Sequence, residues 1–582
     1  MRIGINFTHD SSVVITDNSG TIIVGMQEER LTRVKNTTKF PFKALEQCVA
    51  FARTVTDEKL RSIHFGTEKP YGGIKRVSLS FDKREFPAFD GQYGYIFPPG
   101  FREQFNGIAK LNEREIFHLM LSEVFRNLQE DLSHCEIYFE NHQRSHAASS
   151  WYGSTFESAL VLSLDGHGDG DSGGCFVGSP DGSLVRLSRF SELNSFGHLY
   201  ASVTQRYNFK PLKHEGKITG LAAYGEYSGA AEFLKKHISI ENGVPKFAIA
   251  SSRRHSQLIR MLREFGLGRN SMRDVLELIE VAESKTKNYS DLAFAVQNVL
   301  ELSILEILDY WAEKTSLRNA TFAGGVFANV KLNQRIRESG LFTDFYVFPA
   351  MGDSGIAAGA IWSTLSREGI KSKTHLSNVF IGPETSSEVN LDEFAVEYLD
   401  HANLSERIVN SLMSQKLVGL ILGRMEFGPR ALGNRTLLID PRDAAINITV
   451  NKRLNRTEFM PFAPICLEDD FLSLFHVESM YQNFKYMTET CEVKDEYKAV
   501  FPAAIHVDGT ARPQFLPRGS NPLLERVIKV FKLKTNCPVL INTSLNIHEE
   551  PIVSDLIDAL KALKTGQIDA LATENQFITL KS

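Results

Sequence analysis

The chain has 582 residues, too many for one hydrophobic core, so roughly two to four domains are expected. Hydrophobic residues make up 42% and charged residues 23%, as in an ordinary globular protein. The formal net charge of −5 argues against a nucleic-acid binder that relies on overall basicity, although local basic pockets are compatible with it. The six cysteines are scattered, no signal peptide is recognised and the apolar runs are only strand-length, so we expect a cytoplasmic protein with no membrane span.

Two stretches of the chain share one strand pattern. The first 26 residues predict three strands, with a polar elbow, Thr8–Ser12, after the first strand. Residues 158–190 repeat this scheme about 160 residues later, and here the elbow is Asp165–Asp169. The pattern predicts a duplicated α/β architecture, in which phosphate and nucleotide chemistry occupies the cleft between the halves. Chance similarity between two ordinary β-hairpins is the alternative.

A histidine pair precedes the second elbow. His142 and His146 stand four residues apart on an alanine-rich segment that should be helical, so both imidazoles can face one point. Asp165, at the end of the next strand, can complete a metal site, since imidazole plus carboxylate suits Zn, Fe or Mn. The spacing alone is weak evidence, because 16 histidines supply roughly half such a pair by chance. Gln143 also replaces the glutamate that a zinc protease would use as its base.

Glycine turns are the next candidates for ligand contacts. Lys217 stands between glycines ahead of a small-residue helix and could approach phosphates, although such Gly-Lys pairs are common. The long helix 291–311 carries a core-facing stripe and leads into a turn at Gly324-Gly325. This turn opens a helix whose free N–H groups can receive a phosphate or ribose. Asp353 lies in another glycine turn and is expected to be a second metal carboxylate or a magnesium–nucleotide contact.

Two segments are predicted to be irregular. Residues 86–101 form an aromatic insert rich in Gly and Pro, which we interpret as a loop or a variable lid. Residues 365–385 are polar and without a strong period, and are interpreted as a linker between domains.

A local basic concentration marks the second domain. Arginines lie among glycines in Gly423–Arg435, and further basic residues follow closely at Arg442, Lys452, Arg453 and Arg456. Arginine binds phosphate or carboxylate bidentately, and glycine permits close backbone approach, so an anion site is predicted, with a solvated basic loop as the alternative. Further on, residues 506–514 contain Arg512, and a buried strand ends in the polar donors Asn542–Asn546, which suit an anionic substrate.

These segments together resemble the O-carbamoyltransferases of the NodU/CmcH type. The resemblance covers nearly the whole chain in order, and its combination of motifs is highly specific. The matching stretches are residues 4–12, 27–35, 142–149, 164–168, 216–225, 323–329, 352–355, 428–435, 461–464, 506–514 and 542–546.

The resemblance implies two coupled domains. Residues 1–365 would form a duplicated actin/sugar-kinase-like (ASKHA) domain, 366–385 a linker, and 386–582 a YrdC-like α/β domain. In the family scheme the second domain converts carbamoyl phosphate and ATP into carbamoyladenylate. The first domain then transfers the carbamoyl group to a hydroxyl of a small-molecule or sugar acceptor. Rival interpretations are an ASKHA-type kinase or ATPase, and a metal- and nucleotide-binding component of tRNA modification, although a nucleic-acid partner is not expected.

The resemblance also assigns site residues. The implied metal ligands are His142, His146, Asp165 and Asp353, with Fe²⁺ first and zinc or manganese as alternatives, and magnesium as a further candidate with ATP. His9 would act as a neutral general base on the acceptor, with Asp10 beside it. Candidate contacts to carbamoyl phosphate and ATP are Lys217, Gly324, Gly325, Asn329, Arg430, Arg435, Lys452, Arg456, Arg512, Asn542, Ser544 and Asn546.

The chain departs from the family pattern near one position. Asn455 stands nearest to a lysine that members often carry, and the spacing is one residue shorter. Arg456 and Lys452 are the candidates to supply this charge. His548 stands where a glycine often occurs.

Overall fold

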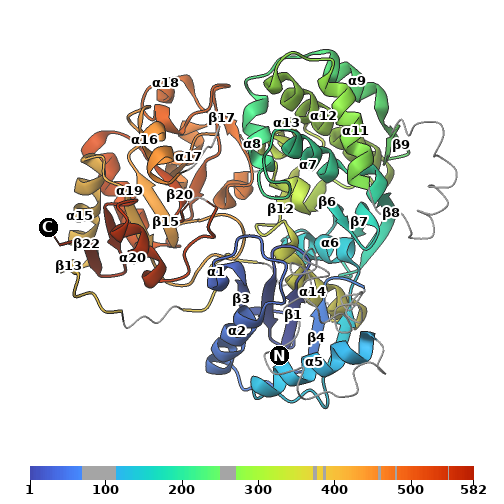
Figure 1. The fold of residues 1–582 in the computed structure, drawn as a ribbon, viewed down its shortest axis with the longest axis horizontal. Helices are drawn as coiled ribbons and strands as arrows, with labels where there is room; N and C mark the ends of the chain where they lie inside the picture. Colours follow the sequence, from blue (N-terminus) through green and yellow to red (C-terminus); the bar gives the residue numbers. More distant parts are fainter. Residues whose placement is uncertain are drawn as a thin grey trace, which may run out of the picture.

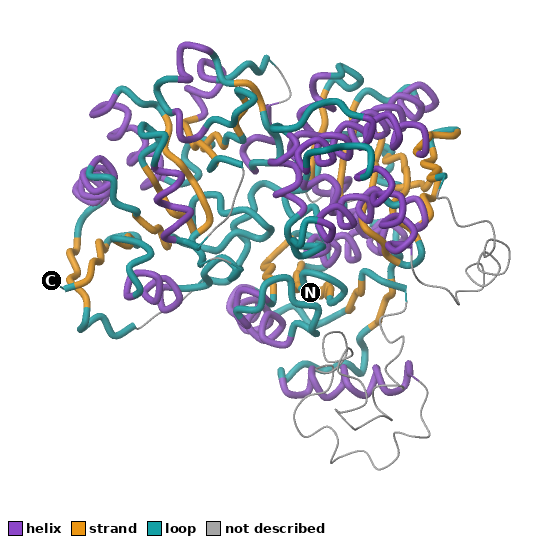
Figure 2. The backbone as a smooth tube through the Cα atoms, turned by 45° about the horizontal axis from the view of Figure 1, so that its top comes forward, coloured by secondary structure: helices purple, strands orange, loops and turns teal. Residues whose placement is uncertain are grey.

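The computed structural model describes residues 1–68, 113–248, 271–370, 376–384, 389–455, 460–478, 481–547 and 549–581. Within them the chain forms an N-terminal domain around two five-stranded sheets and a C-terminal domain around an eight-stranded sheet (Figure 1). Helices flank the strands in both domains (Figure 2), which confirms the predicted α/β class. The predicted insert at 86–101, Arg456 and His548 lie outside the described residues.

The two N-terminal sheets have the same topology. The first has the order β3-β2-β1-β4-β5, and the second the order β8-β7-β6-β11-β12. In each, three consecutive strands pair antiparallel, and two later strands add in parallel on the other side of the first strand. The predicted duplication is therefore confirmed. The strands are β1 (Arg2–Asn6), β2 (Ser12–Thr16), β3 (Ile22–Gln27), β4 (Ser62–Phe65), β5 (Glu136–Phe139), β6 (Ala159–Gly168), β7 (Asp171–Gly178), β8 (Leu184–Ser191), β11 (Asn319–Ala323) and β12 (Asp344–Val347).

Two small-residue helices, α6 (His142–Gly153) and α14 (Ile356–Arg367), form the layer between these sheets. Helix α14 contacts β1, whereas α6 contacts β6 and β11. They pack closely, because a Cβ added to Gly359 would lie 1.9 Å from the carbonyl oxygen of Ser145. The alanine-rich segment that holds His142 and His146 thus lies at the centre of the domain. The remaining N-terminal helices are α1 (Glu29–Thr32), α2 (Phe42–Val55), α5 (Glu113–Asn127), α7 (Phe196–Arg206), α8 (Glu215–Ala222), α9 (Gly229–His237), α11 (Ser271–Glu283), α12 (Tyr289–Thr315) and α13 (Val330–Glu338), with the hairpin β9 (Ile238–Glu241) and β10 (Val244–Phe247).

The C-terminal domain is built on one mixed sheet of order β13-β22-β21-β14-β15-β20-β16-β19. Its apolar strands and the buried faces of α15 and α19 form a separate hydrophobic core. The strands are β13 (Phe394–Tyr398), β14 (Val418–Ile421), β15 (Arg435–Ile439), β16 (Ala463–Leu467), β19 (Gln514–Leu516), β20 (Val539–Ser544), β21 (Ala570–Ala572) and β22 (Gln576–Leu580), with the short pair β17 (Cys491–Glu492) and β18 (Thr510–Ala511). The helices are α15 (His401–Met413), α16 (Ile446–Arg453), α17 (Glu468–Leu474), α18 (Asp495–Lys498), α19 (Pro522–Thr535) and α20 (Leu556–Lys564).

The segment between the domains forms backbone hydrogen bonds to both of them. Helix α14 extends to Arg367, so the first two residues of the expected linker 366–385 are helical. The carbonyl of Ile381 accepts a hydrogen bond from the N–H of Gly25 on β3 (2.9 Å), and the N–H of Gly382 donates to the carbonyl of Met425 (2.9 Å). The described part of this segment therefore packs between the domains. No helix of the described chain is both long and apolar enough to cross a membrane.

Candidate active site

Helix α6 aligns the two histidines as the sequence predicts. Asn141 caps its start by accepting the N–H of Arg144 (3.2 Å), so the helix begins at His142. His142 and His146 lie one turn apart, with ring centroids separated by 4.8 Å. Both side chains are buried, with residue exposures of 1% and 0%. The helix thus presents two imidazoles to one point in the interior.

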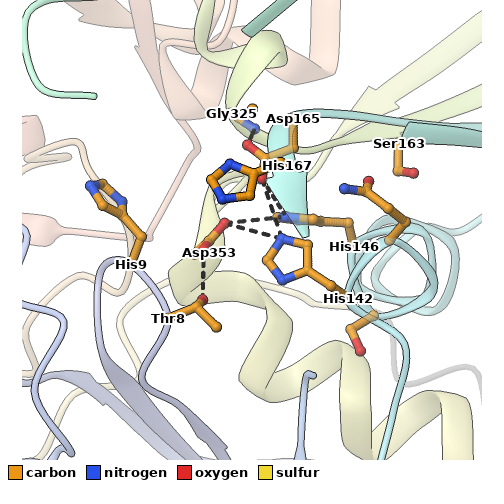
Figure 3. Close-up of polar contacts among 12 residues, drawn as sticks. Thr8, His9, His142, His146, Ser163, Asp165, His167, Gly325 and Asp353 are labelled. Carbon is orange, nitrogen blue, oxygen red and sulfur yellow. Dashed lines mark hydrogen bonds and ion pairs between the residues drawn. The ribbon is translucent and has the colours of Figure 1, made fainter. Parts of the chain in front are cut away.

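Two carboxylates meet these imidazoles (Figure 3). Asp165 comes from β6 and Asp353 from the short 3₁₀ turn Asp353–Gly355 that precedes α14. The Nε2 atom of His142 is 3.2 Å from Asp165 Oδ2 and 3.6 Å from Asp353 Oδ1. For His146 Nε2 the same two distances are 3.8 Å and 3.3 Å. All four residues can therefore offer a ligand atom within 4.8 Å of one another.

This donor set fits a divalent cation. Two imidazoles and two carboxylates suit Fe, Zn or Mn. Both nitrogens of the buried His146 ring lack a hydrogen-bond partner among the described residues, as a ligand awaiting its ion would. The carboxylates raise the pKa of His146 to about 9, although burial lowers it, so metal binding has to displace a proton. The four residues predicted from the sequence are brought together.

Neighbouring groups hold three of the four candidate ligands in place. The hydroxyl of Thr8 donates to Asp353 Oδ2 (2.7 Å), and the N–H of Gly325 donates to Asp165 Oδ1 (3.2 Å). The N–H of His142 donates to the carboxylate of Asp169 (2.8 Å). Such partners fix ligand orientation and tune the metal. Thr8 and Asp169 carry no distinctive sequence signal beyond their places in the two elbows.

The N–H groups of Gly324 and Gly325, which the sequence predicts to bind an anion, both have partners within the protein. The N–H of Gly324 donates to the carbonyl of Met351 (2.7 Å), and that of Gly325 donates to Asp165. The carboxamide of Asn329 caps α13 and donates to Gln297 (2.8 Å). The two N–H groups have these partners because the turn closes against β6 and serves the metal ligand.

His9 lies on the other side of Asp353 from the paired histidines (Figure 3). His9 Nδ1 is 3.3 Å from Asp10 Oδ2, and Asn36 donates to the second oxygen of Asp10 (2.5 Å). Burial lowers the pKa of His9, but the carboxylates of Asp10, Asp353 and Asp165 together raise it to about 9. A cation held by Asp353 and Asp165 would act in the opposite direction and favour the neutral imidazole that the sequence predicts.

The C-terminal candidates separate into structural and accessible residues. The guanidinium of Arg435 is fully buried and donates to the carbonyls of Leu422 (2.6 Å) and Ser554 (2.9 Å). Asn542 is likewise buried in the sheet, where it donates to Gln514 (2.6 Å). Both side chains therefore have partners inside the domain, which residue type alone does not reveal.

The other C-terminal candidates remain compatible with ligand contacts. Arg430 and Arg512 are half-buried, and Lys452 is exposed on α16. Ser544 ends β20 and donates to Asn546 (2.5 Å), next to the start of β15. Lys217, a candidate in the N-terminal domain, is buried on α8, and its Nζ lies 5.1 Å from the ring centre of Phe209.

A domain junction connects the metal cluster to the arginine-bearing loop. The peptide of Gly428 is held on both sides: its N–H donates to Gln27 Oε1 (3.2 Å), and its carbonyl accepts from Arg30 Nη2 (2.7 Å). A Cβ on Gly428 would lie 3.2 Å from the carbonyl of Pro349, four residues before Asp353. Arg33 adds bonds to the carbonyls of residues 551 and 552, both 2.8 Å. Residues 27–35, a motif to which the sequence assigns no function, therefore form hydrogen bonds between the two domains.

Comparison with known proteins places the chain. Residues 1–362 match the family described as carbamoyltransferase N-terminus, and residues 409–580 match carbamoyltransferase C-terminus. The chain belongs to the carbamoyltransferase family and is an enzyme of that family, which confirms the resemblance to the NodU/CmcH type.

The relatives include characterised and uncharacterised proteins. Nodulation protein NolNO of Sinorhizobium fredii is 29% identical over 98% of this chain and 79% of its own length. Uncharacterized protein MJ1058 of Methanocaldococcus jannaschii is 30% identical over 99% of this chain and 98% of its own. The 3'-hydroxymethylcephem-O-carbamoyltransferase of Streptomyces clavuligerus is 32% identical over 42% of this chain and 46% of its own. Among solved structures, T. kodakarensis HypF is 12% identical with a TM-score of 0.34, covering 64% of this chain and 48% of HypF, a likeness too low to support an argument.

Proposed function

We propose that the enzyme is an ATP-dependent O-carbamoyltransferase with two coupled sites. The observation that carries this proposal is the His142, His146, Asp165 and Asp353 cluster. Gly428 of the carbamoyltransferase C-terminus packs against Pro349, four residues before Asp353. An activated carbamoyl group hydrolyses if it is released, so a water-excluding junction between activation and transfer favours product formation.

The proposed chemistry has two steps. In the C-terminal domain, which we take to be YrdC-like, water first splits carbamoyl phosphate into carbamate and phosphate. The carbamate oxygen then attacks the α-phosphate of ATP, which gives carbamoyladenylate as pyrophosphate leaves. Arg430, Arg512 and Ser544 are the candidate contacts for these anions, since arginine forms paired hydrogen bonds to phosphate. ATP would bring magnesium with it.

In the second step the acceptor hydroxyl attacks the carbamoyl carbon. The new C–O bond forms as the C–O bond to the phosphate breaks, and AMP leaves with the electron pair. The hydroxyl proton passes to His9, which must first lose the proton that its carboxylate neighbours favour. The four-residue cluster would hold Fe²⁺, zinc or manganese, which supplies Lewis-acid polarisation of a carbonyl when bound.

Purified protein with carbamoyl phosphate and ATP tests the proposal. We expect pyrophosphate and carbamoyladenylate, detected by chromatography of quenched samples, and a carbamoylated product by mass spectrometry when a panel of sugars and small hydroxylated compounds is added. ADP without pyrophosphate would instead indicate a kinase or ATPase. Neither nucleotide product, in protein loaded with each candidate metal, would refute the proposed activity.

A further inference from the structure

The second elbow carries a histidine near the carboxylate cluster. His167 lies at the end of β6, two residues after Asp165, and its strand pairs with β7 through Gly168 and Asp171. Both elbows meet at the carboxylate cluster, and Figure 3 shows the His167 ring beside Asp165. His167 is not one of the four candidate metal ligands, and the sequence assigns it no function.

A buried partner orients His167. Its Nδ1 is 3.2 Å from Nε2 of His198, and the two ring centroids are 5.1 Å apart. His198 is only 5% exposed and lies in the first turn of α7, which Ser195 caps. The Ser195 hydroxyl also lies 2.6 Å from the carbonyl of Gly166, which ties the helix start to the elbow. The helix therefore holds the supporting imidazole at a fixed place behind the exposed one.

The pair can orient a hydrogen-bond donor. Burial and the neighbouring His167 lower the pKa of His198 to about 4, so His198 is neutral at physiological pH. When His198 Nε2–H donates to His167 Nδ1, the remaining proton of His167 is on Nε2. The ring of His167 is exposed near Asp165, a position that a purely structural histidine pair would not need.

We propose that His167 is a catalytic residue whose Nε2–H donates a hydrogen bond to the carbamoyl oxygen as negative charge develops on it, and that His198 is its positioning residue. This inference rests on the proposed carbamoyl transfer. His167 keeps its proton throughout: the acceptor oxygen bonds to the carbamoyl carbon, AMP leaves with the electron pair, and the acceptor proton passes to His9. A donor aimed at developing charge contributes more to the transition state than to the bound substrate.

Quenched-flow kinetics with water as the only acceptor separates the two steps without knowledge of the natural acceptor. In His167→Ala we expect carbamoyladenylate to form within about twofold of the wild-type rate and to break down about 10²-fold more slowly, the usual loss on removing such a donor. His167→Asn, which restores an N–H, should recover part of this loss. His401→Ala, at an exposed position on α15 of the C-terminal domain, is the matched control and should change neither step.

Coupling between the two histidines provides the second test. His198→Phe should slow breakdown about 10-fold, and the double variant should be no slower than His167→Ala, because His198 acts through His167. Histidine ¹⁵N spectra of metal-free protein should show the Nε2–H tautomer at His167, lost in His198→Phe. Unchanged breakdown in His167→Ala, additive losses in the double variant, or loss of metal from His167→Ala would overturn the inference. Absence of carbamoyladenylate in the wild type would instead refute the proposed function.

Discussion

Gly168 ends β6 and packs against His142, one of the four candidate metal ligands. A Cβ built at this position would lie 2.2 Å from Cγ and Cδ2 of His142, where ordinary contact begins at 3.4 Å. His142 is buried and its N–H is tied to Asp169, so the ring has little free space into which it can move. Gly168→Ala therefore perturbs a metal ligand without changing any polar group.

The geometry determines the size of the effect. The His142 ring, or the hairpin, must shift by about 1 Å, and a displacement of this size in a catalytic group costs about 10²-fold in rate. Overpacking of this kind destabilises by about 1–3 kcal/mol, and displaced ligand support weakens metal binding about 10–100-fold. We expect Gly168→Ala to fold with a lowered Tm and to lose most of its metal.

Metal stoichiometry after purification, chelator competition and thermal unfolding measure these effects. Gly170→Ala is the matched control, because it lies in the same hairpin with nothing within 4 Å of the added Cβ. Its φ of +86° makes alanine strained there, by about 1–2 kcal/mol, so it destabilises the hairpin without touching His142. Wild-type metal affinity in Gly168→Ala, or equal metal loss in Gly170→Ala, would refute the reasoning.

Three further predictions concern the junction, a buried acid and the metal. Arg30→Met should leave the rate of pyrophosphate release within about twofold of wild type but lower carbamoyl transfer at least about 10-fold, because it removes the hydrogen bond to the Gly428 carbonyl. Arg33→Met keeps that hydrogen bond and should lower transfer less. Equal losses of transfer in the two variants would argue against a specific role of Arg30. Burial raises the pKa of Glu489 to about 8, although the Arg337 guanidinium lies 3.1 Å away, so the folded protein binds one more proton than the unfolded chain. The free energy of unfolding should therefore fall as the pH rises from about 4.5 to 8, by on the order of 1.4 kcal/mol per pKa unit. The Tm of Glu489→Gln should lack this dependence on pH. His146→Ala should abolish stoichiometric metal binding and slow transfer at least about 10²-fold while pyrophosphate release persists; full metal content in a chelator-washed sample would contradict the assigned ligand set.

Much of the centre of this protein could be predicted from sequence because local geometry determines it. Residues four apart on a helix share a face, so His142 and His146 had to converge once α6 formed. Strand ends followed by polar elbows are equally local, which is why the duplication was visible in the hydrophobic pattern and why Asp165 could be placed beside the pair.

The tertiary structure decided which polar groups are available to a ligand. Arg435 and Arg430 have the same side chain and neighbouring positions in one motif, yet Arg435 is fully buried against backbone carbonyls, whereas Arg430 is half-buried. The N–H of Gly325 was expected to bind phosphate and instead bonds a metal ligand 160 residues earlier in the chain. The sequence does not pair His167 with His198, because only the packing of α7 brings His198 Nε2 to 3.2 Å from His167 Nδ1. Residue type determines which bonds a group can form, but packing between distant segments determines which partner it finds, because a buried polar group must be paired wherever the fold places it.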